Sequence, residues 1–161
     1  MGKKITFLAI IFLALGAGLF LYLGNQNKNN FANSALANND IVVYKTANCG
    51  CCLNYINYMA RQGLEVETKN VSEDDIARIK DEYEIPHDMW SCHTSLVGRY
   101  IVEGHIPLEA IEKLVSENPD IRGIAMPGMP SGSPGMPGLK TRPFEIYSLH
   151  NNGSTELFMG L

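Results

Sequence analysis

Three cysteines within four residues, in the segment Cys49-Gly50-Cys51-Cys52, constrain this chain more than any other feature of its sequence. The β-branched and aromatic stretch 41–44 precedes them and predicts a strand. A helix is expected from about Gly50 to Gln62, and Gly63 suits the position after a helix C-terminus. The unpaired N–H groups and the positive dipole end of a helix N-terminus favour thiolate over thiol. The segment therefore predicts a chemical site at a strand-to-helix junction.

The spacing limits the disulfides that these cysteines can form. Cys49 and Cys52 are three residues apart and can share one helix face. Cys51 and Cys52 are adjacent, with Cα atoms about 3.8 Å apart, whereas a disulfide prefers roughly 4.4 to 6.8 Å. At most one pair is expected within the segment, which leaves a sulfur over. The fourth cysteine, Cys92, precedes His93, and this pair adds a soft and a borderline metal ligand.

Three interpretations remain open on these residues alone. The first is a metal site that combines the three clustered cysteines with the Cys-His pair. The second is a thiol-disulfide oxidoreductase that uses Cys49 and Cys52. Against it stand the extra thiol of Cys51 and the Cys-His pair where thioredoxin-like enzymes usually have a residue followed by cis-proline. The third is a binding module held by two structural disulfides, which adjacent thiols fit badly.

The N-terminal 23 residues predict a membrane segment. Lys3 and Lys4 precede an uncharged run of 19 residues, 5–23, which as a helix would span about 28 Å. The lysines should stay cytoplasmic, so the rest of the chain is exported. An uncleaved anchor is favoured over a cleaved signal peptide because the A-x-A motif at 35–37 lies well downstream of the run.

The remaining chain divides into a tether and one domain. Residues 24–40 are rich in asparagine and poor in large apolar residues, which predicts a solvated tether. Residues 41–161 have the length of one small domain. The formal net charge is −4 and the lysines and arginines are scattered, which argues against nucleic acid as a partner.

The hydrophobic pattern predicts an α/β domain. After the first strand and helix we expect a strand at 64–68, a helix opened by Ser72 and stopped by Pro86, a hairpin at 94–97 and 100–103, and a helix from Pro107 to about Glu117. This β-α-β-α-β-β-α order is the thioredoxin-like order. A Gly/Pro/Met loop at 126–138 and a C-terminal β-hairpin at 144–147 and 155–158 complete the expected fold.

Four ordered segments, 46–52, 91–94, 102–107 and 127–136, resemble the CopG-like family, whose members are exported, thioredoxin-like and copper-associated proteins. The resemblance covers about residues 41–161. It implies a periplasmic copper-binding protein that holds Cu(I), as a multinuclear cluster, for copper tolerance, transfer or redox conversion. The candidate metal ligands that it implies are Cys49, Cys51, Cys52, Cys92 and His93. One departure is Tyr55, since many relatives carry a tryptophan just after the cysteines.

Further donors and partners follow from the same resemblance. Spacing alone does not separate copper from zinc or an iron–sulfur cluster, and export together with soft donors favours Cu(I). The accessory candidates are His105, Met126, Met129 and Met136. His105 is expected to be a loop histidine unless the family match holds, and packing is the commoner role of methionine. The expected partners are copper ions, other periplasmic copper-handling proteins and the inner membrane through residues 5–23, and a binding role is favoured over an enzyme.

Overall fold

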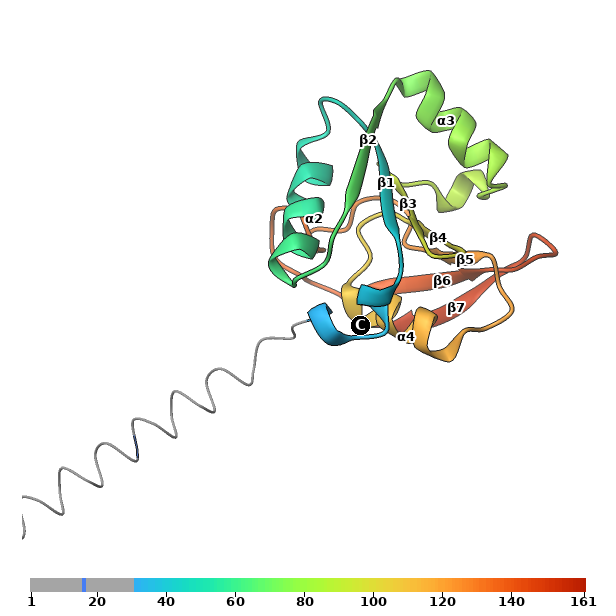
Figure 1. Ribbon diagram of the computed structural model, residues 1–161. Helices are drawn as coiled ribbons and strands as arrows, with labels where there is room; N and C mark the ends of the chain where they lie inside the picture. The colour runs from blue at the N-terminus through green and yellow to red at the C-terminus, as the bar shows by residue number, and fades with distance from the viewer. Residues whose placement is uncertain (1–15, 17–30) are drawn as a thin grey trace, which may run out of the picture. The chain divides into compact units, whose positions relative to one another are not determined.

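The computed structural model describes residue 16 and residues 31–161 (Figure 1). The membrane segment predicted for residues 5–23 lies outside the described residues except for Gly16, and the first part of the predicted tether also lies outside them. Among the described residues, no helix has the length and apolar character needed to cross a membrane.

A mixed sheet with the strand order β2-β1-β3-β4-β5-β6-β7 organises the domain (Figure 1). Its strands are β1 Ile41–Thr46, β2 Glu67–Val71, β3 Thr94–Val97, β4 Tyr100–Glu103, β5 Gly123–Ala125, β6 Glu145–Leu149 and β7 Thr155–Gly160. The pairs β1–β2 and β4–β5 are parallel, and the other neighbouring pairs are antiparallel.

Helices cover both faces of this sheet. They are α2 Gly50–Arg61, α3 Glu73–Glu82 and α4 Leu108–Glu117, with short 3-10 helices η1 Phe31–Asn33, η2 Leu36–Asn38 and η3 His87–Met89. Neighbouring residues of a strand point to opposite faces. Val102 of β4 accordingly packs in the larger core with Tyr55 of α2 and Leu114 of α4, while Ile101 packs in a smaller cluster with Met89 of η3. In Figure 1, α2 and α3 lie on opposite sides of β1 and β2.

Local signals in the sequence define the ends of α3 and α4. The Ser72 hydroxyl caps α3 by accepting a hydrogen bond from the Asp75 N–H at 3.1 Å, as the sequence predicts. Helix α4 ends at Asn118, whose φ of 47° is left-handed. Asparagine tolerates this conformation better than most residues.

The predicted α/β order, the Gly/Pro/Met loop and the terminal hairpin are confirmed. Strand β2 begins at Glu67, three residues after the predicted start. Strand β5 was not predicted, because its three residues are too few to form a periodic pattern.

Residues 31–39 differ from the tether that the sequence predicts. They form η1 and η2, and Leu36 is fully buried in the larger core. The Glu112 carboxylate of α4 accepts hydrogen bonds from the N–H groups of Ala35 at 3.1 Å and Leu36 at 2.9 Å. The buried side chain of Leu36, the partly buried Phe31 and Ala37, and the Glu112 carboxylate attach this segment to the domain.

Candidate metal centre

Strand β1 leads directly into the cysteine segment. The Cys49 N–H donates to the carbonyl of Thr46, and the Cys49 sulfur caps α2 by accepting from the Cys52 N–H at 3.3 Å. Cys49 and Cys52 form a disulfide with a Cα–Cα distance of 5.3 Å. The sequence predicts at most one disulfide within residues 49–52, and the structure has one there, between cysteines three residues apart. The sulfur left over is that of Cys51, which is in no disulfide.

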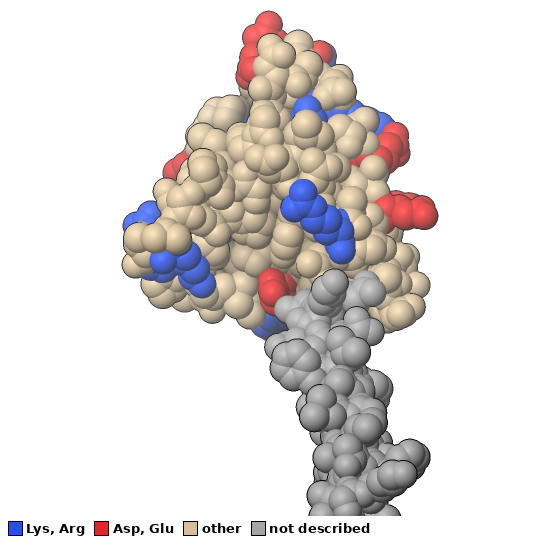
Figure 2. Space-filling model, turned by 90° about the vertical axis from the view of Figure 1, so that its left-hand side faces the viewer, with Lys and Arg blue, Asp and Glu red and all other residues tan. Residues whose placement is uncertain are grey.

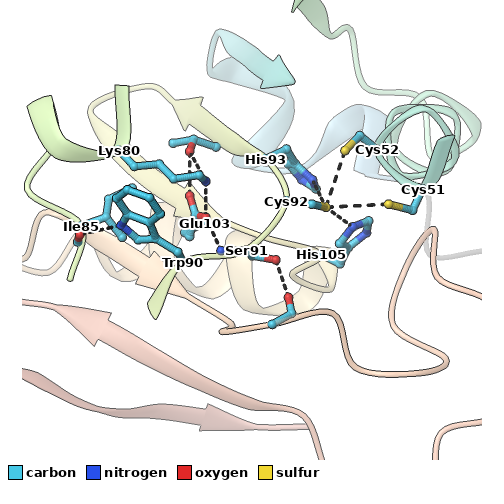
Figure 3. A network of polar contacts seen from close by, with 12 residues as sticks. Cys51, Cys52, Lys80, Ile85, Trp90, Ser91, Cys92, His93, Glu103 and His105 are labelled. Carbon is cyan, nitrogen blue, oxygen red and sulfur yellow. Dashed lines mark hydrogen bonds and ion pairs between the residues drawn. The ribbon is translucent and has the colours of Figure 1, made fainter. Parts of the chain in front are cut away.

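The loop that enters β3 brings Cys92 to this helix start. Its sulfur lies 3.5 Å from that of Cys52 and 3.8 Å from that of Cys51, although about forty residues separate them in the chain (Figure 3). The Cys51 sulfur lies 3.5 Å from that of Cys49. All four sulfurs fall within 4.8 Å of one another. The structure thus brings together the four cysteines that the sequence selected.

Of the two histidines near Cys92, His105 has the ring nitrogen closest to the sulfur, as suits the accessory ligand that the family resemblance implies. Its Nε2 lies 2.8 Å from the Cys92 sulfur, and its Nδ1 lies 2.7 Å from the carbonyl oxygen of Pro134. A carbonyl only accepts, so Nδ1 carries the proton and the Nε2 lone pair faces the sulfur. The Gly/Pro/Met loop therefore sets the tautomer of a histidine in a different segment.

The register of the β3–β4 hairpin predicts that His105 lies next to Cys92. Strands β3 and β4 are antiparallel, and their register pairs Val97 with Tyr100 and Thr94 with Glu103. Each step back along β3 is therefore matched by one step forward along β4. Extending this register two residues outward pairs Cys92 with His105. The bond from the Gly104 N–H to the His93 carbonyl, at 3.0 Å, continues the ladder in this direction. A predicted hairpin is thus enough to bring these two side chains to the same end of the sheet.

His93 lies behind Cys92 and is fully buried. Its Nδ1 is 3.5 Å from the Cys92 sulfur, and its ring centroid is 4.7 Å from the ring centroids of Tyr55 and His105. Among the described residues, its Nε2 has no hydrogen-bond partner. A buried nitrogen without a hydrogen-bond partner is costly. The nitrogen that faces the Cys92 sulfur is Nδ1, which is therefore the atom of His93 available to a metal ion there.

Tyr55 supports both histidines from α2. It is fully buried, and its hydroxyl donates to the carbonyl of Ile106 at 2.8 Å. Its ring centroid lies 5.5 Å from that of His105. Burial raises the pKa of Tyr55 far above its usual value, so the hydroxyl stays protonated and the hydrogen bond persists. The departure from the family pattern at this point thus affects the packing of the site.

Burial keeps Cys92 and the two histidines neutral. It raises the pKa of the Cys92 thiol to about 12, and the neighbouring Cys51 acts in the same direction. It also lowers the pKa of His93 well below the usual value and lowers that of His105. The imidazole lone pairs are therefore available at neutral pH, and a metal ion would have to displace the thiol proton.

The three methionines differ in their environments. Met126 is buried in the larger core, so it has the packing role, whereas Met129 is half exposed and Met136 is partly buried. The loop around Met136 lies on the first turns of α2. A Cβ built on Gly135 would come within 2.7 Å of both the Cys51 carbonyl oxygen and the Tyr55 nitrogen. This close approach requires glycine.

The two segments that surround the cysteines carry no charge. No lysine, arginine, aspartate or glutamate occurs in residues 47–60 or in residues 123–139. Figure 2 shows the face on which α2 lies, and charged side chains are few and scattered over it. These two segments therefore add no charge to the outer face of the candidate site.

Comparison with known proteins places the chain in a family. A family model described as "Protein of unknown function, DUF411" matches residues 89–136. A solved structure of copper resistance protein CopG, Form 2, shares 36% sequence identity over 76% of this chain and 98% of that chain, with a TM-score of 0.69. The chain belongs to the CopG family. CopG Form 1 gives 35% identity over 76% of this chain and 96% of that chain, with a TM-score of 0.68.

The family assignment agrees with the resemblance noted in the sequence. The part that matches DUF411 in this CopG-family chain extends from the end of η3 to Met136. It contains Cys92, His93 and His105 but not the cysteines of α2. A search of curated proteins gives no match.

Proposed function

We propose that this protein binds copper as Cu(I) on the cluster of cysteines and histidines at the start of α2. The observation that carries the proposal is the placement of four sulfurs within 4.8 Å of one another, with the Nε2 of His105 2.8 Å from the Cys92 sulfur. Thiolate and imidazole are ligands that suit Cu(I). The similar solved structures are those of a copper resistance protein, which supports copper over zinc or iron.

The proposed ligands are those that the sequence selected, with His105 added. They are Cys49, Cys51, Cys52, Cys92, His93 and His105. All four sulfurs can bind metal only after a reductant has converted the Cys49–Cys52 disulfide to two thiols, which takes two electrons and two protons. The reduced site offers more soft donors than the roughly two to four that one Cu(I) requires, so the chain should hold more than one ion.

The remaining features of the proposal concern fold and location. The arrangement of β1 to β5 with the three described α-helices supports a thioredoxin-like core, to which β6 and β7 are added. We assign the protein to the periplasm, held at the inner membrane by residues 5–23, because of the charge pattern of the N-terminus. There it would take part in copper tolerance, exchanging copper with other periplasmic copper-handling proteins or converting its oxidation state.

Anaerobic titration of the reduced, purified full chain tests this function. A chromophoric Cu(I) chelator serves as competitor, and the number of ions removed from it per chain is counted. We expect more than one equivalent for the reduced protein and fewer for protein in which the disulfide of Cys49 and Cys52 is kept oxidised. Saturation of the reduced chain below one equivalent would rule out the multinuclear site.

A second function is supported by the disulfide itself. Cys49 is partly exposed and its partner Cys52 is fully buried, as an attacking sulfur and a protected sulfur would be. A thiol-disulfide oxidoreductase that uses this pair would lose activity on Cys49→Ser and keep it on Cys92→Ser. Measurement of insulin reduction by the two variants distinguishes this function from copper binding.

A further inference from the structure

A buried ion pair lies beside the candidate site and was not predicted from the sequence. Lys80 of α3 and Glu103 of β4 are almost fully buried, and the ammonium group contacts one carboxylate oxygen directly (Figure 3). The Lys80 ammonium also donates to the Thr94 hydroxyl at 2.9 Å, and that hydroxyl donates to the second carboxylate oxygen of Glu103 at 2.7 Å. Every member of the network is therefore hydrogen-bonded.

The same carboxylate holds the backbone at the other end of the ligand segment. The Ser91 N–H donates to Glu103 at 2.6 Å. Ser91 and Thr94 flank Cys92 and His93, so one side chain fixes both ends of the four-residue segment that carries these candidate ligands. Glu103 also stands two residues before His105 in the chain. Two proposed ligands thus lie in a segment whose two ends are both held by this carboxylate.

Close backbone packing leaves this segment little freedom to shift. Gly104 has a φ of +87°, and a Cβ there would lie 2.7 Å from the Ser91 side chain and 2.8 Å from the Met126 carbonyl oxygen. The Ser91 hydroxyl donates to the Gly128 carbonyl. The Trp90 carbonyl accepts from the Gly128 N–H at 3.2 Å. The ligand segment is therefore clamped between Glu103 on one side and the start of the Gly/Pro/Met loop on the other.

Stability alone is a weak reason for a buried ion pair at this position. Removing two charges from water is costly, and well-packed apolar residues of similar volume often give equal or greater stability. What an apolar pair does not supply is an acceptor for the Ser91 N–H and the Thr94 hydroxyl. A role of Glu103 in positioning therefore requires this acceptor, whereas a role in stability alone does not.

We infer that Glu103, neutralised by Lys80, is a positioning residue that holds Cys92 and His93 against the start of α2. The inference rests on the proposed function for its meaning, but the placement of Cys92 can be measured without copper. In the native protein the carboxylate accepts from both ends of the ligand segment and so fixes the distance from the Cys92 sulfur to those of Cys51 and Cys52.

Two double variants isolate the acceptor at position 103. The apolar double variant, Lys80→Met with Glu103→Leu, removes both charges and the acceptor. The amide double variant, Lys80→Met with Glu103→Gln, removes both charges but keeps an amide oxygen for the Ser91 N–H and an amide N–H for the Thr94 hydroxyl. The two proteins share the substitution of Lys80, and they differ at position 103 only in whether the side chain can form hydrogen bonds.

The copper-free measurement uses Cys52 as a probe of where Cys92 lies. In a Cys49→Ser, Cys51→Ser background, equilibration with glutathione gives the effective concentration of the Cys92 thiol toward Cys52. The apolar double variant should show a fall of roughly tenfold or more, as is typical when a group that orients a ligand is lost. The amide double variant should show a clearly smaller fall, because its side chain keeps partners for the Ser91 N–H and the Thr94 hydroxyl. Cu(I) affinity, measured with all four cysteines present, should fall in the same order.

The outcomes separate this inference from the proposed function. Equal effective concentrations in the apolar and amide double variants would overturn the positioning role. The effective concentration could fall only in the apolar double variant while the protein with all four cysteines binds no Cu(I). That result would support the positioning role and overturn the copper function. If the apolar double variant does not fold, Thr94→Val takes its place, because it removes one of the two hydrogen bonds from the ligand segment to the carboxylate. An unchanged effective concentration in that variant would equally refute the inference.

Discussion

Replacement of Cys92 by serine is the perturbation that tests the candidate site most directly. The Cys92 sulfur is the point at which the two parts of the site meet, since it lies 3.5 Å from the Cys52 sulfur and 2.8 Å from the Nε2 of His105. Serine keeps a hydroxyl that can donate to His105, so the free energy of unfolding should change by less than about 1 kcal/mol. A soft, negatively charged ligand is lost, however.

The expected loss of copper affinity can be bounded from below. Groups that only orient metal ligands contribute roughly 10 to 100-fold to metal affinity, and a ligand itself should contribute at least as much. We therefore expect Cys92→Ser to weaken Cu(I) binding by at least about tenfold, or about 1.4 kcal/mol. Anaerobic competition with a chromophoric Cu(I) chelator measures this change, and denaturant unfolding checks that the fold is kept.

Ser95→Ala provides the matched control. Ser95 lies three residues further along and is buried, and its hydroxyl has no hydrogen-bond partner among the described residues. Its removal should leave both affinity and stability nearly unchanged. Full copper affinity in Cys92→Ser, together with insulin reduction that needs only Cys49 and Cys52, would refute the copper site and support the oxidoreductase.

Three further predictions test other parts of the structure. His105→Ala should lower Cu(I) affinity roughly tenfold in the same competition assay, and an unchanged affinity would remove His105 from the ligand set. Gly135→Ala should destabilise the fold by more than about 1 kcal/mol in denaturant unfolding, because φ is +83° and the new Cβ would clash with α2. Glu112→Gln should cost about 1 kcal/mol at pH 7, because it weakens the hydrogen bonds from the Ala35 and Leu36 N–H groups. Burial would raise the pKa of Glu112, but these hydrogen bonds outweigh it and lower the pKa, so its contribution is complete above the unfolded pKa and is lost as pH falls through the folded one. A difference in stability between the native protein and the Glu112→Gln variant that persists at acidic pH would contradict this assignment.

The part of the site that depends on local spacing could be predicted from the sequence. Three thiols at a strand-to-helix junction indicate a chemical centre whatever the rest of the chain does. The metal-site interpretation combined these thiols with the Cys-His pair, and the structure brings Cys92 next to Cys51 and Cys52. His105 was only an accessory candidate, because a loop histidine was judged by its neighbours in the chain and not by its partner across the hairpin.

Other features depend on packing that no local pattern contains. Leu36 stands in an asparagine-rich stretch with few apolar neighbours, yet it reaches the larger core because Glu112 satisfies the backbone beside it. Lys80 occupies an ordinary position on an amphipathic helix, where a lysine is usually exposed. Its burial depends on the carboxylate of Glu103, 23 residues further along the chain. Contacts between residues so far apart in the chain can be identified only when the arrangement of the strands is known.

The absence of charge from the two segments that surround the cysteines has a kinetic consequence. Oppositely charged surfaces accelerate the encounter of two proteins, and salt removes that acceleration. Residues 47–60 and 123–139 offer no charge with which to attract a copper-carrying partner. An exchange of copper through this face should therefore proceed at the rate of unsteered association, about 10⁵ to 10⁶ M⁻¹s⁻¹ at most. It should also change little between dilute buffer and high salt.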